Sequence, residues 1–90
     1  MMGRPRKHSL TLRGHRTSVS LEDEFWTAFR AIAARDGRAL NALAAEIDAA
    51  RGTETGLASA IRIYVLRRLQ RDLAQAGAAP PPSPPPTRQA

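Results

Sequence analysis

The sequence contains no cysteine, few aromatic residues and no long hydrophobic run. The absence of cysteine excludes a disulfide scaffold, a thiolate zinc site and a cysteine nucleophile, and it fits a reducing compartment. No apolar stretch approaches the roughly 18 residues that a membrane span needs, and no signal peptide is recognisable near the N-terminus. We therefore expect a small cytoplasmic protein without a membrane partner.

The sequence also lacks the residue patterns of an enzyme. It has no nucleophile–base pair, no phosphate-binding loop and no cluster of metal ligands, since His8 and His15 are isolated. Glu46 and Asp48 are two residues apart in a predicted helix, so they do not share a face as paired catalytic carboxylates would. We expect no catalytic activity, no metal site and no cofactor.

Acidic residues are absent from the first 16 positions, so charge is distributed unevenly along the chain. The 90 residues carry 14 basic and 8 acidic side chains, a net charge of +6, and all but one of the basic residues are arginine. The basic residues among the first 16 positions are Arg4, Arg6, Lys7, Arg13 and Arg16. Arginine suits bidentate contacts with phosphates and guanine, so this excess of charge favours nucleic acid as a partner over a role in solubility alone.

Residues 16–21 alternate between the two faces of an extended strand. The side chains expected on the core face are Thr17, Val19 and Leu21, and those expected on the opposite face are Arg16, Ser18 and Ser20. Leu21 anchors this assignment, because it leads directly into the apolar stripe of the helix that follows.

Three helices are predicted after the strand. Apolar residues at helical spacing predict a first helix over 22–36, which ends at Gly37, and a second over 40–50. A third is predicted over 57–75, after a break at 52–56. The expected core, shared between two chains, contains Val19, Leu21, Phe25, Trp26, Phe29, Ile32, Leu43 and Ile47.

A single strand cannot satisfy its own backbone hydrogen bonds, and no second strand is obvious in the core. Residues 9–13 also alternate, and they either form a separate strand before a turn at Gly14 and His15 or continue into the main strand. The simplest partner for residues 16–21 is the same strand of a second chain, antiparallel about a two-fold axis. The small foldable part of about 65 residues also favours an obligate homodimer.

The order of strand, helix, glycine turn and helix, written here as LRGHRTSVSLEDEFW, LNALAAEIDAARG and LASAIRIYVL, resembles a bacterial branch of the ribbon-helix-helix family. That family includes the Arc and methionine repressors. The resemblance covers about two thirds of the chain and implies a mainly α-helical fold with one short β-strand, assembled as an intertwined homodimer with a two-stranded antiparallel ribbon between chains. The third helix is either an addition to the family's minimal unit, or the family's second helix interrupted at 52–56.

The resemblance implies that the ligand is double-stranded DNA. The ribbon would present its outward side chains to base edges in the major groove: Arg16, Ser18 and Ser20. The expected phosphate contacts come from Arg13, Arg38 and the amides near Asn41. Ala39 replaces the serine or threonine that often caps the family's second helix, which weakens the anion site without removing its backbone donors.

We expect three regions: a flexible basic arm over 1–8, a folded domain over 9–76, and a disordered proline-rich tail over 77–90. The arm would contact phosphates, or the minor groove as an AT-hook does, through Arg4, Arg6 and Lys7. The expected function is sequence-specific DNA binding by a transcriptional regulator. Two alternatives remain: an antitoxin of the same fold that binds a protein partner through the C-terminal helix or tail, and a dimeric interaction module without specific DNA binding.

Overall fold

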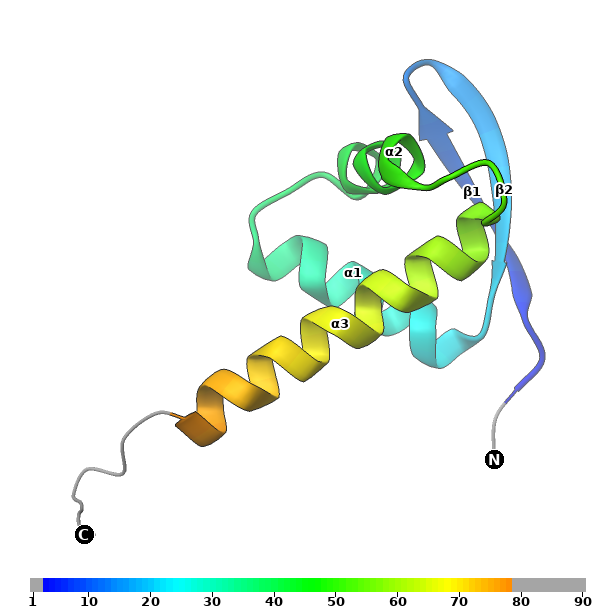
Figure 1. The fold of residues 1–90 in the computed structure, drawn as a ribbon. Coiled ribbons are helices and arrows are strands. Elements are labelled where there is room, and N and C mark those ends of the chain that lie inside the picture. The colour runs from blue at the N-terminus through cyan, green and yellow to red at the C-terminus, as the bar shows by residue number, and fades with distance from the viewer. Residues whose placement is uncertain (1–2, 79–90) are drawn as a thin grey trace, which may run out of the picture.

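A computed structural model describes residues 3–78 as a two-stranded sheet packed on three helices (Figure 1). The elements are β1 (Arg6–Leu12), β2 (His15–Leu21), α1 (Asp23–Arg35), α2 (Leu40–Ala50) and α3 (Leu57–Ala78). Helix α2 packs against β1, whereas α1 and α3 pack against β2. The predicted helices agree with the observed ones to within three residues at each end. Of the proline-rich tail, residues 79–90 lie outside the described part.

Strand β2 has a partner strand in its own chain, so the fold has two strands where we expected one short strand. Strand β1 pairs with it antiparallel, from Arg6 opposite Leu21 to Leu12 opposite His15. The question left open by residues 9–13 is therefore answered: they belong to a separate strand and its turn. Residues 6–8, which we expected in a flexible arm, form the start of that strand.

A two-residue turn at Arg13 and Gly14 joins the strands. Both residues have positive φ angles, 53° and 83°. Positive φ at both central positions is the geometry of the type I′ turn, whose twist matches that of a β-hairpin. Gly14 adopts this conformation without a steric penalty, so the glycine that could have lain inside one long strand instead reverses the chain.

One face of the hairpin is buried against the helices. Leu10 and Leu12 from β1 lie beside Val19 and Leu21 from β2, because residues that alternate along a strand share a face. The helices cover this face with Phe29, Ile32, Ala33, Leu43, Ala44, Ile47, Ile61 and Val65. Of the core residues expected from the sequence, Phe25 and Trp26 are only partly buried, at the edge of the cluster.

Helix α3 completes the core within a single chain. Ile61 and Val65 are almost fully buried against the other elements, so the helix is a structural part of the domain. A small domain gains much of its stability from such apolar burial. Among residues 3–78, no helix is both long enough and apolar enough to cross a membrane.

Replacing Leu10 with alanine tests whether β1 belongs to the core. Leu10 is 2% exposed, so Leu10→Ala should lower the free energy of unfolding by about 2–5 kcal/mol, through lost burial and the cavity left behind. The neighbouring Ser9 is exposed on the opposite face, and Ser9→Ala should change stability by less than about 0.5 kcal/mol. Urea unfolding followed by circular dichroism measures both. Equal stability of the two variants would show that β1 does not pack as described.

Candidate nucleic-acid interface

The face of the hairpin that points away from the helices carries only polar side chains. Residues opposite one another in an antiparallel pair project from the same face, so β1 and β2 contribute three cross-strand pairs. These pairs are Lys7 with Ser20, Ser9 with Ser18, and Thr11 with Arg16. All six residues are exposed, and we call them the outer hairpin face.

The three base-reading residues predicted from the sequence, Arg16, Ser18 and Ser20, all lie on the outer hairpin face. The register leaves no alternative, because a shift by one residue would turn the buried Val19 outward. Their β1 neighbours were not predicted, since the polar start of β1 looks like an arm. The signal that could have revealed them is the alternation that continues backwards from Leu12 through Leu10.

Positive charge surrounds this face and no acidic residue lies in either strand. Lys7 and Arg16 belong to the face itself, and Arg13 is exposed at the tip of the hairpin. Arg4 is exposed just before β1, whereas Arg6 lies 3.8 Å from a carboxylate oxygen of Asp23. The distribution suits a polyanion, because phosphates at both ends of the hairpin would meet a cation.

The outer backbone edge of β2 is available for further pairing. A two-residue turn makes Leu12 and His15 a hydrogen-bonded pair, and hydrogen-bonded pairs alternate with non-hydrogen-bonded pairs along an antiparallel ladder. The N–H and C=O groups of Arg16 and Ser18 therefore point away from β1. Two bonds agree with this alternation. On the opposite edge, the Thr11 N–H donates to Asn41 Oδ1 at 3.1 Å, and beyond Ser18 the Ser20 carbonyl accepts from an Arg62 nitrogen at 3.4 Å.

Two of the predicted phosphate ligands have partners within the chain. Arg38 donates to both carboxylate oxygens of Glu46, at 2.8 and 3.0 Å, and this pair raises the pKa of Arg38 and lowers that of Glu46. Asn41 holds the edge of β1 through its bond to Thr11. Ala39 provides no side-chain cap for α2, as the sequence indicated. A phosphate at the start of α2 would therefore compete with existing contacts, whereas Arg13 remains exposed.

Helix α3 fixes the junction between β2 and α1. Arg62 donates to a Glu22 carboxylate oxygen at 2.9 Å, and its guanidinium carbon lies 5.8 Å from the centre of the Phe25 ring. The pKa of Glu22 is lowered, first by a backbone hydrogen bond and then by the bond from Arg62. Because Arg62 also reaches the Ser20 carbonyl, α3 helps to hold the last residue of the outer hairpin face in place.

A second set of ion pairs joins α3 to the end of α1. Arg68 donates to both oxygens of Asp36, at 2.6 and 2.7 Å, and to Asp72 at 3.3 Å. The hydrogen bonds from Arg68 are the main reason that the pKa of Asp36 is lowered. Arg35 also reaches Asp72, at 3.0 Å. Residues 3–78 contain no group of three or more side chains that could hold a metal ion.

One family profile, described as a ribbon-helix-helix domain, matches residues 5–69. The matched region begins just before the hairpin and extends through α1 and α2 into α3. Searches among curated proteins and solved structures found no match.

The ion pair between Arg68 and Asp36 predicts a specific dependence of stability on pH. The pKa of Asp36 in the folded chain lies below its ordinary value of 3.8. The pair therefore contributes stability above that pH and loses it as the pH falls through the lower, folded value. Arg68→Met should be less stable than the parent at about pH 7, and the difference should shrink at about pH 2.

Chemical unfolding at several pH values measures this difference. Arg67→Met is a suitable control, because Arg67 has no carboxylate within ion-pair distance in the described part of the chain. A stability difference for Arg68→Met that stays constant across the whole pH range would contradict the assignment.

Proposed function

The chain belongs to the ribbon-helix-helix family, and we propose that it is a homodimeric, sequence-specific DNA-binding protein that regulates transcription. Domains of this family are typically found in DNA-binding regulators and antitoxins, and they generally form dimers. The observation that carries the proposal is the outer hairpin face. Its six exposed positions are all polar or basic, on a ribbon whose other face is buried.

The outer hairpin face has the chemistry required for reading DNA. The major groove of DNA admits a two-stranded ribbon, and arginine there pairs bidentately with guanine. Arg16 would supply that contact, while Ser18 and Ser20 either donate or accept hydrogen bonds at neighbouring bases. Lys7 and Arg13, near opposite ends of the hairpin, would bind phosphates and fix the position of the ribbon on the duplex.

In the proposed dimer, the free edge of β2 pairs with β2 of a second chain. An exposed edge with unpaired N–H and C=O groups is a template for another strand. Pairing about a two-fold axis keeps both outer hairpin faces on the same side of one sheet. The base-reading side chains of both chains would then form the central ribbon, with β1 beside it. A groove of about 400 Å³ borders this edge at Thr17, Ser18 and Leu57, which supports access for a second strand.

Replacing Arg16 tests the reading of bases. Each dimer would lose two contacts, so Arg16→Ala should weaken binding by about 1–3 kcal/mol per lost base contact and relax the preference at symmetric positions of the site. Folding should not change, because Arg16 is exposed. Arg30→Ala, an exposed arginine on α1, is the matched control.

Binding selection from random DNA, with a melting curve for each variant, measures both effects. If Arg16→Ala binds the selected site as tightly as the parent protein does, Arg16 does not contact the bases. A loss of folding in that variant would show that the register is shifted by one residue.

A proline at Ser18 tests the dimer interface. The Ser18 N–H points away from β1, so Ser18→Pro should leave the hairpin folded while it removes one donor from the proposed pairing with the second chain. Ser18→Ala removes the same hydroxyl but keeps this N–H. Sedimentation without DNA should therefore give a monomer for the proline variant and a dimer for the alanine variant. A dimeric proline variant with parent-like helical content would place the interface elsewhere.

A further inference from the structure

The large hydrophobic side chains exposed in the described part of the chain all lie on α3. They are Ile63 (44% exposed), Leu66 (53%), Leu69 (44%) and Leu73 (75%). Their spacing of three and four residues places them along one side of the helix, and we call them the α3 stripe. Ile61 and Val65, which pack into the core, lie on another side of the same helix. The stripe is therefore not part of the core.

The α3 stripe continues where α3 leaves the body of the domain. Figure 1 shows that the C-terminal end of α3, beyond the ion pair between Asp72 and Arg35, extends past α1 and α2. An isolated helical segment gains little stability in water, and leucines along it add no contacts unless another surface covers them. Contiguous exposed apolar residues of this kind mark interaction sites in soluble proteins.

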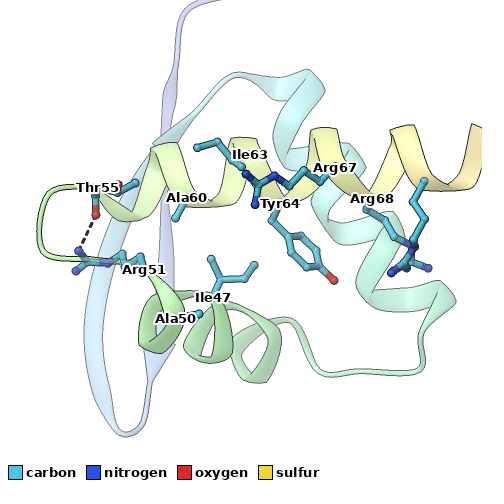
Figure 2. A pocket seen from close by; sticks show the side chains of 10 residues that line it. Ile47, Ala50, Arg51, Thr55, Ala60, Ile63, Tyr64, Arg67 and Arg68 are labelled. Atoms are coloured by element: carbon cyan, nitrogen blue, oxygen red, sulfur yellow. Dashed lines mark hydrogen bonds between the residues drawn. The ribbon is translucent and has the colours of Figure 1, made fainter.

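A groove between α2 and α3 adjoins the stripe at Ile63. Its volume is about 450 Å³. Figure 2 shows Ala60 and Tyr64 directed from α3 towards α2, and Ile47 directed from α2 towards α3. The stripe and the groove thus share Ile63, and together they offer an apolar surface along much of α3.

Arginine side chains border this surface. Arg67 and Arg71 follow Ile63 at intervals of four residues and line the groove. Two other arginines of the groove are neutralised, because Arg51 pairs with Asp48 and Arg68 pairs with Asp36. In the described part of the chain, neither Arg67 nor Arg71 has a carboxylate within ion-pair distance. The apolar surface is therefore flanked by two arginines that form no ion pair within the described part of the chain.

We propose that the α3 stripe and its flanking arginines form the docking site for a protein partner that presents an acidic amphipathic helix. Apolar anchors at helical spacing would cover the stripe, as in helix-in-groove recognition, and carboxylates beside them would reach Arg67 and Arg71. A second copy of the chain fits this site poorly. Its α3 offers one acidic residue, Asp72, which Arg35 and Arg68 already bind.

Binding of a labelled synthetic peptide to the full-length protein tests the proposal. The probe is a monomeric amphipathic helix with leucines on one face and glutamates on the other, and the matched peptide carries lysines in place of the glutamates. Fluorescence anisotropy should show the glutamate peptide binding at least about tenfold more tightly than the lysine peptide. Added salt should reduce this preference.

Variants separate the two parts of the site. Leu69→Gln combined with Leu73→Gln should weaken binding of the glutamate peptide at least about tenfold, without loss of melting temperature or DNA binding. Arg67→Gln combined with Arg71→Gln should remove the preference for glutamate over lysine. Arg30→Gln, on α1, should change neither property. Intact DNA binding in the leucine variant also makes failure here distinguishable from failure of the proposed function.

Three results would overturn the proposal. The two peptides could bind the parent protein equally well, or the leucine variant could bind the glutamate peptide as tightly as the parent does. The third result would come from sedimentation without peptide: the parent protein and Ser18→Pro would be dimers, whereas the leucine variant would be a monomer. The occupant of the stripe would then be a second copy of the chain.

Discussion

The register of the β1–β2 hairpin determines the arrangement of the rest of the molecule. The turn at Arg13 and Gly14 places Leu12 opposite His15, and every further pair follows from that one. In this register the leucines of β1 share a face with Val19 and Leu21, while the outer hairpin face carries only polar side chains. This one turn thus determines which side chains of the strands are buried by the helices and which are exposed to solvent. A shift by one residue would reverse the two faces and destroy the core.

Ile61 and Val65 of helix α3 pack into the core of their own chain, beside residues of the hairpin, α1 and α2. The proposed dimer forms through backbone pairing at the edge of β2, which leaves the hairpin intact in each chain. The same helix holds the start of α1 through Arg62 and its end through Arg68. One side of α3 therefore contacts the rest of the domain, and another side carries the exposed α3 stripe.

The sequence predicts the parts of this fold that depend on local periodicity. The two faces of β2 and the three helices follow from alternation, helical spacing and the glycine after α1. Alternation left open a separate strand over residues 9–13, but the start of β1 at residues 6–8 was assigned to the arm, because these residues are polar or basic and no local rule separates such a strand end from an arm. The hydrogen-bond partners of Arg38 and Asn41 could not be predicted from the sequence either. Asn41 binds a backbone group 30 positions away, and Arg38 binds a carboxylate on the next helix, contacts that only the packed structure brings together.

The central claim is that the outer hairpin face binds DNA, and amide chemical-shift mapping tests it most directly. On titration of the labelled protein with its selected duplex, the largest shifts should fall on the outer hairpin face, including Ser9, Thr11 and Ser18, and they should weaken with added salt. Amides near Arg30, on α1, should stay unchanged. The account would be contradicted if the hairpin signals stayed in place while those around Arg67 and Arg71 moved, because DNA would then bind α3 instead.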